Sequence, residues 1–294
     1  MPAIRVTFGY YPVHTDLQTG DISLIALPGL QQTVKDVEAS EGVVDRWIYA
    51  PSSNGRSGRI FRLPKTHSLN HENADSVEHL EFLVWCFSFF VGMRLTTTEA
   101  GFLDATPIKP RTLTDLVLSE NELSDLLSLA ESFWQKHHHN PRDVKRVVSI
   151  IHALFLAQYP LYLQVEEFTY LYIALDACYA LAKSMCGAPP KITHARRLDW
   201  ICKKFGLAVP SWAIPGASKA TEVSAVRNHT LHEALFFEEP LGFSTYGGKA
   251  SQKENVPLEM QALICRLLVA LLGKPKCYYV SSPVNTGSMF GLYR

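Results

Sequence analysis

A short polar motif late in the chain carries the side chains best suited to phosphate chemistry. Arg227 and Asn228 are followed by His232, in the pattern R-N-x-x-x-H. A guanidinium matches the geometry of a phosphate group, and an imidazole exchanges protons near neutral pH. On a helix Asn228 and His232 lie one turn apart and share a face, whereas Arg227 and His232 lie about 140° apart. The motif therefore predicts a broad polar helix face that binds a phosphate ester.

The spacing of Arg and His alone is weak evidence, because chance also produces it. With 14 Arg and 11 His in the chain, about half an occurrence of R-x-x-x-x-H is expected. A second copy runs from Arg62 to His67, but it contains Pro64 and cannot be helical. The copy at 227–232 lies inside a predicted helix, and we favour it for that reason.

A basic stretch precedes this motif and is suited to a polyanion. Its cations are opposed by Asp199, and rings are interleaved among them. The candidate RNA-binding residues are Lys191, Arg196, Arg197, Lys203 and Lys204, and the rings are His194, Trp200, Phe205 and Trp212. Cations that bind phosphates and rings that stack on bases are typical of single-stranded RNA binding. A solvated helix face with ordinary aromatic anchors is an equally open alternative.

Other catalytic and metal-binding patterns are missing from the sequence. It has no P-loop, dinucleotide-binding or H-E-x-x-H motif and no nucleophile elbow. His137, His138 and His139 are consecutive and point about 100° apart on a helix, so we interpret them as an exposed helix C-terminus. The six cysteines lack a C-x-x-C pair and mostly fall in apolar helical patterns, which indicates buried free thiols. We therefore predict no metal site and no cofactor.

Composition restricts the class of protein. The chain has 294 residues, with 28 basic and 28 acidic side chains, so any polyanion must be met by a local patch. A hydrophobic fraction of 47% excludes wholesale disorder. The N-terminus lacks the basic start and apolar run of a signal peptide, and the most apolar stretch, Phe82 to Met93, is too short to span a bilayer. We expect a soluble, cytoplasmic protein that does not enter the membrane.

The elements that must position these residues fall into two parts. The first 70 residues alternate apolar and polar positions between turn signals, and strands are predicted at 4–8, 22–27, 43–49 and 59–63. From Asp75 the period becomes helical, and a long apolar helix is predicted at 76–94. We assign residues 1–110 to a β-rich N-terminal sensing or docking domain.

The remaining residues, 111–294, are predicted to form a helical bundle, which makes the fold class α+β. Helices are predicted at 119–137, 142–159, 163–186, 193–205, 218–237 and 257–272. In the helix at 163–186, Asp176 lies one position off the apolar stripe and should be half-buried. A half-buried carboxylate needs a partner, and Arg227 is the obvious candidate.

The motif and its setting resemble the HEPN superfamily of helical-bundle proteins, many of which are metal-independent ribonucleases. The resemblance rests on R-N-x-x-x-H at Arg227–His232. It rests also on the stretch from Phe168 to Asp176, where an acidic residue follows small and apolar positions. It covers roughly residues 115–275. The subgroup it most resembles is the ApeA-like HEPN proteins, which pair a β-rich N-terminal region with such a bundle.

The resemblance implies a metal-independent endoribonuclease that is a toxin or an antiviral defence effector. The RNA 2′-hydroxyl would attack the adjacent phosphorus, with His232 as general base or acid and Arg227 stabilising the charged phosphorane. Asn228 would orient His232 or the phosphate, and Asp176 completes the expected catalytic set. HEPN ribonucleases build a shared site, so the resemblance also implies a homodimer, with an antitoxin or a trigger protein as a further partner.

Two other functions stay open. The bundle could be a non-catalytic HEPN dimer that binds nucleotide, RNA or a protein partner. In that case Arg227 pairs with Asp176, and His232 is a core or interface residue. Alternatively, the β-rich domain recognises a foreign protein or ligand and the bundle only oligomerises, which a trigger-dependent activity would distinguish from a constitutive nuclease.

Overall fold

The computed structural model divides the chain into two compact units, Met1–His139 and Asn140–Arg294. It describes residues 3–49, 60–97, 102–103, 105–116, 122–187, 191–216, 220–228, 237–238, 242–243 and 256–285. Helices and strands are mixed in an α+β structure, as the sequence indicates. The expected boundary between residues 110 and 111 lies inside the first unit, because α3 (Leu123–His137) packs on α2 (Val77–Val91).

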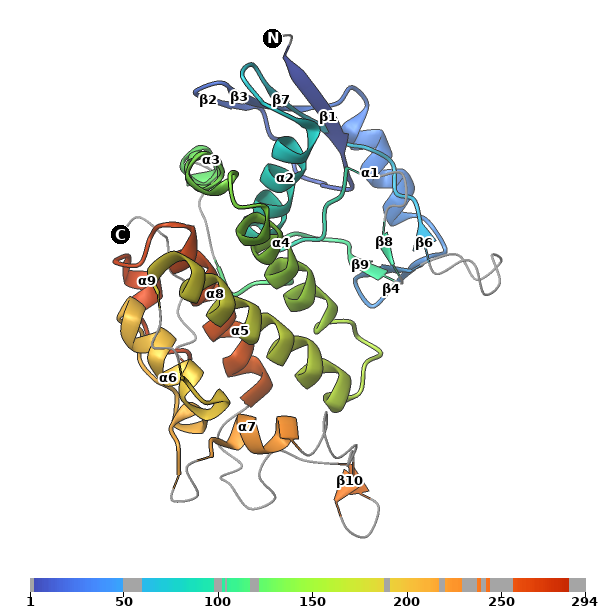
Figure 1. Cartoon of the computed structure of the whole chain (residues 1–294). Coiled ribbons are helices and arrows are strands. Elements are labelled where there is room, and N and C mark those ends of the chain that lie inside the picture. Colours follow the sequence, from blue (N-terminus) through green and yellow to red (C-terminus); the bar gives the residue numbers. More distant parts are fainter. Residues whose placement is uncertain are drawn as a thin grey trace. The chain divides into compact units, whose positions relative to one another are not determined.

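A four-stranded antiparallel sheet forms the centre of the N-terminal unit, in the order β1-β7-β3-β2 (Figure 1). Its strands are β1 (Ile4–Phe8), β2 (Leu17–Thr19), β3 (Ile22–Ala26) and β7 (His67–His71). The sequence patterns do not predict β7, because His-Ser-Leu-Asn-His lacks an apolar alternation. Two neighbouring strands supply its hydrogen bonds, so that its last residue, His71, is paired with both β1 and β3.

The other short elements of this unit are α1 (Leu30–Glu38), β4 (Val43–Val44), β5 (Trp47–Tyr49), β6 (Ile60–Phe61), β8 (Phe102–Leu103) and β9 (Ala105–Pro107). Strands β4, β5 and β9 form one antiparallel sheet, and β6 pairs with β8. The strands predicted at 43–49 and 59–63 are therefore present in shorter form. Helix α1 was not expected, because it is a mostly polar segment that buries only Leu30 and Val37.

Helix α2 connects the sheet of this unit to α3, and the prediction of a helix at 76–94 is confirmed. The Ser76 hydroxyl accepts a hydrogen bond from the backbone N–H of His79 at the helix start. The helix ends at Gly92, whose φ of 59° favours glycine. Most side chains of α2 are buried, because the helix contacts β1, β7 and α3. Phe87, for example, meets the ring of Phe8 edge-on, with 6.1 Å between ring centroids.

Helix α5 (Gln164–Cys186) is the centre of the C-terminal unit and packs against α4 (Pro141–Leu156), α6 (His194–Phe205) and α8 (Val256–Leu272). These four helices confirm the predictions at 142–159, 163–186, 193–205 and 257–272 within a few residues. The remaining helices are a 3₁₀ turn, Ser211–Ala213, α7 (Glu222–Arg227) and α9 (Tyr278–Ser281). Of the described helices, none has the length and apolar character that a membrane crossing requires.

The helix predicted at 218–237 is described only in part, because residues 218–219 and 229–236 lie outside the described residues. Helix α7 covers Glu222–Arg227, and Phe237 and Glu238 form a strand, β10, which pairs with β11 (Gly242–Phe243). The prediction of an entirely helical bundle is therefore wrong at this point. Apolar residues up to Phe237 continued the helical pattern, but the antiparallel pairing of β10 with β11 provides an alternative for the backbone.

His67 makes the stability of the N-terminal unit dependent on pH. Its side chain is fully buried against Phe8 and Tyr11, with ring centroids 5.7 and 5.2 Å away. Burial lowers the pKa of His67 to about 4. The unfolded chain, with an imidazole pKa of about 6.5, binds more protons between these values. The contribution of the neutral ring is therefore complete above about pH 6.5 and is lost as the pH falls towards 4.

We expect the free energy of unfolding of this unit to fall by about 3 kcal/mol over that window. Native-state hydrogen exchange of the β7 amides measures this quantity for the N-terminal unit alone. A His67→Phe variant keeps a buried ring but cannot be protonated, so this part of the pH dependence should disappear. An identical pH profile in the variant would contradict the assignment to His67.

Candidate functional site

One face of α5 carries three of the residues from which the site is built. Tyr172, Asp176 and Tyr179 are four and three residues apart and lie on the same side of the helix. The two tyrosine side chains are buried, and that of Asp176 is half-buried, as its position beside the apolar stripe predicted. The other sides of α5 pack on α4 and α8, so this face is left for α6 and α7.

Helix α6 places two further polar side chains on this face. Arg197 Nη1 donates to Asp176 Oδ1, and its Cζ lies 4.8 Å from the centroid of the Tyr179 ring. One turn earlier, His194 Nδ1 lies 3.1 Å from the Tyr172 hydroxyl oxygen. The expected pairing of Asp176 with Arg227 is therefore wrong, because the packing of α6 on α5 brings the guanidinium of Arg197 to this carboxylate.

Helix α7 brings Arg227 close to the same face. A reciprocal capping box between Thr221 and Ser224 starts this short helix, and Arg227 is its last residue. The Cζ of Arg227 lies 5.9 Å from the centroid of the Tyr172 ring, and its Nη1 donates to Asn228 Oδ1 at 3.0 Å. Its Nε is buried and has no hydrogen-bond partner among the described residues.

These side chains form what we call the bundle cluster: Tyr172, Asp176, His194, Arg197 and Arg227. Two guanidiniums and one carboxylate leave it one positive charge when His194 is neutral (+2 − 1 = +1). Burial raises the pKa of the Tyr172 hydroxyl, Asp176 raises it further, and Arg227 and Arg197 oppose the shift. Tyr172 is therefore a neutral hydroxyl at pH 7. Because Arg197 is paired with Asp176, the cluster offers a phosphate the guanidinium of Arg227, a hydroxyl and an imidazole.

Four of the five residues predicted to bind RNA lie on α6, and Lys191 lies three residues before it. Lys191, Arg196, Lys203 and Lys204 are exposed. Arg196 and Lys203 are seven residues apart and share one helix face, and Arg197 and Lys204 share the neighbouring face. Two of these cations are paired with carboxylates. Lys203 Nζ lies 2.7 Å from Asp199 Oδ1, and Arg197 Nη1 binds Asp176 Oδ1.

The rings predicted to stack on bases are only partly available. Trp212 is buried and donates to Glu259 Oε2 at 2.8 Å, so its prediction as a base-stacking ring is wrong. Trp200 meets the ring of Tyr179 edge-on, at 5.7 Å between centroids. Both rings instead make contacts within the C-terminal unit, and these contacts stabilise the positions of α6 and of the 3₁₀ turn.

His232 lies outside the described residues, and its geometry relative to Arg227 stays a prediction. Asn228 is described, is exposed, and accepts the hydrogen bond from Arg227. Sequence reasoning missed Tyr172 as a polar member of the site, because it belongs to the apolar stripe of α5. His194 was noted as a ring in the basic stretch, but its contact with Tyr172 depends on the packing of α6.

Among the described residues, one group of side chains that could ligate a metal ion lies in the N-terminal unit. It consists of His71, His79 and Glu131, and the sequence analysis did not predict that these residues meet. His138 and His139 are exposed at the end of α3, as expected. Of the six free cysteines, Cys186 is exposed and Cys277 is partly exposed, whereas Cys86, Cys178, Cys202 and Cys265 are buried.

Comparison with known proteins does not assign this site to a family. The chain matches no protein-family model, no curated protein and no solved structure. The chemistry of the bundle cluster and of the basic face of α6 is therefore the basis for a functional proposal.

Proposed function

We propose that the chain is a metal-independent endoribonuclease of HEPN type, and that the bundle cluster forms its active site together with His232. The observation that carries the proposal is the position of Arg227. This arginine of the R-N-x-x-x-H motif lies 5.9 Å from the ring of Tyr172, on the same α5 face as Asp176 and its partner Arg197. The guanidinium of Arg227, which is hydrogen-bonded to the Asn228 amide, and a neutral hydroxyl beside it suit a phosphodiester.

In the proposed reaction the 2′-hydroxyl of RNA attacks the neighbouring phosphorus. His232 accepts or donates the proton, because an imidazole has a pKa near the working pH. Arg227 stabilises the charge of the phosphorane. Asn228 accepts a hydrogen bond from Arg227, so we assign it the role of orienting this guanidinium. Asp176 acts as a positioning residue that holds Arg197 over Tyr179.

The substrate would be single-stranded RNA held along α6. Arg196 and Lys204 are exposed cations of α6, and Lys191 is an exposed cation just before this helix. The β-rich N-terminal unit would sense a trigger or dock an inhibitor, which fits a cytoplasmic toxin or antiviral effector. The alternative is a non-catalytic bundle that binds RNA or nucleotide through the same cations.

The first experiment separates the chemical step from binding. We expect His232→Ala to reduce RNA cleavage by about 10²–10⁴-fold, because proton transfer is lost. RNA affinity should change little, since a neutral imidazole contributes little to the binding of a polyanion. His229→Ala is the matched control, because it removes another histidine of the same segment and should cleave normally. Product ends are measured by mass spectrometry and should be 2′,3′-cyclic phosphate and 5′-hydroxyl.

Two conditions make this experiment decisive. A substrate with 2′-deoxyribose at the scissile position should bind but resist cleavage, and cleavage of RNA should persist in excess EDTA. Normal cleavage of the deoxy substrate would contradict attack by the 2′-hydroxyl. Binding of RNA by the wild type without cleavage under any condition would favour the non-catalytic alternative.

The second experiment tests the basic face of α6. We expect the double variant Arg196→Ala, Lys204→Ala to bind RNA more weakly and to lower the slope of log K against log salt by about 1.4, because about 0.7 per phosphate contact is lost on a single strand. Cleavage at saturating RNA should be unchanged. Arg142→Ala with Lys145→Ala removes two exposed cations of α4 as the matched control. Equal salt slopes in the two double variants would exclude α6 as the binding face.

The third experiment concerns assembly. A shared site requires two chains, so we expect a homodimer in which two motifs flank one phosphate. Analytical ultracentrifugation should give a dimer at micromolar concentration. Specific activity should fall on dilution as the dimer dissociates. A monomer that retains full specific activity at every concentration would rule out a shared site.

A further inference from the structure

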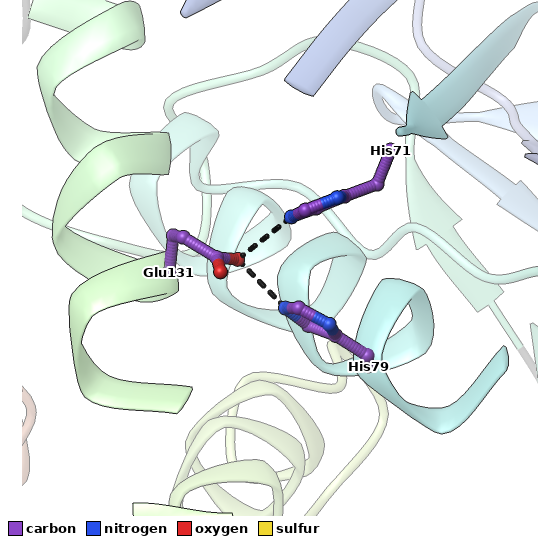
Figure 2. A group of neighbouring side chains, drawn as sticks. All are labelled: His71, His79 and Glu131. Carbon is purple, nitrogen blue, oxygen red and sulfur yellow. Dashed lines mark hydrogen bonds and ion pairs between the residues drawn. The ribbon is translucent and has the colours of Figure 1, made fainter. Parts of the chain in front are cut away.

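Three side chains from different elements of the N-terminal unit converge on one point. His71 is the last residue of β7, His79 lies in the first turn of α2, and Glu131 lies on α3. Figure 2 shows both imidazoles directed at the carboxylate. Glu131 Oε2 lies 2.6 Å from His79 Nε2 and 3.3 Å from His71 Nε2. The three ligand atoms are all within 4.8 Å of one another.

The surroundings of this group are those of a prepared binding site. Both histidines are buried, at 3% and 0% exposure, and the Glu131 side chain is 20% exposed. Gln135 Nε2 donates to Glu131 Oε1 at 2.7 Å, which directs the other carboxylate oxygen at the imidazoles. The Trp134 ring stacks on His79 at 4.6 Å between centroids. These contacts leave few other orientations for His79 and Glu131.

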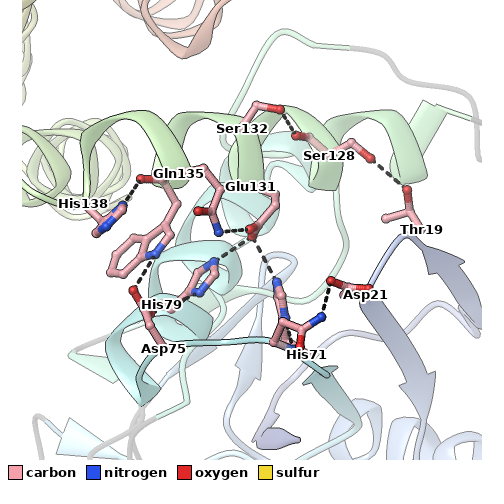
Figure 3. Close-up of polar contacts among 12 residues, drawn as sticks. Thr19, Asp21, His71, Asp75, His79, Ser128, Glu131, Ser132, Gln135 and His138 are labelled. Carbon is pink, nitrogen blue, oxygen red and sulfur yellow. Dashed lines mark hydrogen bonds and ion pairs between the residues drawn. The ribbon is translucent and has the colours of Figure 1, made fainter. Parts of the chain in front are cut away.

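A second carboxylate lies behind the His79 ring. Asp75 Oδ1 is 3.3 Å from His79 Nδ1, and Asp75 Oδ2 accepts a hydrogen bond from Trp134 Nε1 (Figure 3). A carboxylate behind a histidine is the usual outer contact of a metal-bound imidazole, where it holds the ring orientation and increases ligand basicity. His79 therefore has one nitrogen for Asp75 and one for the point shared with Glu131 and His71.

We propose that His71, His79 and Glu131 bind a divalent transition-metal ion of the Zn²⁺ class. Two imidazole nitrogens and one carboxylate oxygen are a known donor set for Zn²⁺, with a fourth position left for water. Donor atoms around a tetrahedral Zn²⁺ lie about 3.3 Å apart, given bonds of about 2.0–2.1 Å. The distance of 3.3 Å between Glu131 Oε2 and His71 Nε2 matches that value, and all three ligand atoms lie within 4.8 Å of one another. The ion would fasten α3 to β7 and α2.

One contact must change when the ion binds. The backbone N–H of Asn73 donates to His71 Nδ1 at 3.1 Å, which keeps the proton of this imidazole on Nε2, facing Glu131. A metal ion at Nε2 displaces that proton, and a neutral ring then carries its proton on Nδ1. The Asn73 hydrogen bond must therefore open. Binding therefore moves the His71 proton from Nε2 to Nδ1 and removes the hydrogen bond from Asn73.

The test uses the untagged full chain, stripped with EDTA and titrated with Zn²⁺ alone. Isothermal titration calorimetry should give one equivalent of bound Zn²⁺ per chain. The thermal midpoint should rise on addition of Zn²⁺. X-ray absorption should report two imidazoles and one carboxylate, and the amide resonance of Asn73 should shift. The last two readouts need no variant.

Variants locate the ion. Glu131→Gln and His79→Gln should abolish the stoichiometric equivalent, and Asp75→Asn should weaken binding by about 10–100-fold. The control is His138→Ala with His139→Ala, which removes exposed histidines of the same α3 end and should keep the equivalent. Loss of binding only in this control would place the ion on the surface histidines and overturn the proposal. So would the absence of Zn²⁺ binding by the wild type.

The proposed metal site and the proposed nuclease activity are tested independently of each other. The metal ligands belong to the N-terminal unit, and the bundle cluster belongs to the C-terminal unit. Removal of the ion should lower the thermal midpoint but leave RNA cleavage unchanged well below that midpoint. A metal requirement of the chemical step itself would contradict the nuclease mechanism, and Zn²⁺ binding would still be decided by the titration.

Discussion

The ion pair between Arg197 and Asp176 organises the candidate site of the C-terminal unit. It joins the exposed side of α5 to α6, and the stacking of the same guanidinium on Tyr179 gives it a defined position. Because the pair is partly exposed, its contribution to stability is small, at about 1 kcal/mol or less. Its consequence is geometric. With Arg197 held there, His194 reaches the Tyr172 hydroxyl, and the other cations of α6 stay on its exposed sides.

The same pair changes the expected role of Arg227. If Asp176 had bound Arg227, the motif arginine would have been neutralised by a carboxylate. Because Arg197 is paired with that carboxylate, the charge of Arg227 beside Tyr172 is not compensated by a carboxylate of the described residues, and Asn228 accepts its hydrogen bond. A guanidinium that is positioned but not neutralised suits a phosphate. This arrangement supports a ligand-binding role for Arg227 over a purely structural one.

The buried histidines of the N-terminal unit illustrate how environment sets the state of one residue type. His67 lies against aromatic rings, and burial lowers its pKa to about 4, so that it is neutral. His79 lies between the carboxylates of Asp75 and Glu131, with Asp75 Oδ1 3.3 Å from its Nδ1 and Glu131 Oε2 2.6 Å from its Nε2. Burial raises the pKa of Glu131, but hydrogen bonds from His79 and Gln135 and the charges of the histidines outweigh it, and the net shift is downward. The same residue type is therefore buried against aromatic rings in one place and between carboxylates in the other.

Sequence patterns alone determined the long helices α2 and α5, the start of α2 at Ser76, and the α+β class. Apolar periodicity and caps are local, and they act before any long-range contact forms. The motif at Arg227 and the cations of α6 were visible for the same reason. Tertiary structure alone decided that the polar strand β7 lies inside the sheet, that Asp176 binds Arg197, and that His71, His79 and Glu131 meet. Each of these depends on which elements pack together, because a polar segment is buried only where neighbours supply its hydrogen bonds, and side chains far apart in sequence meet only through the fold.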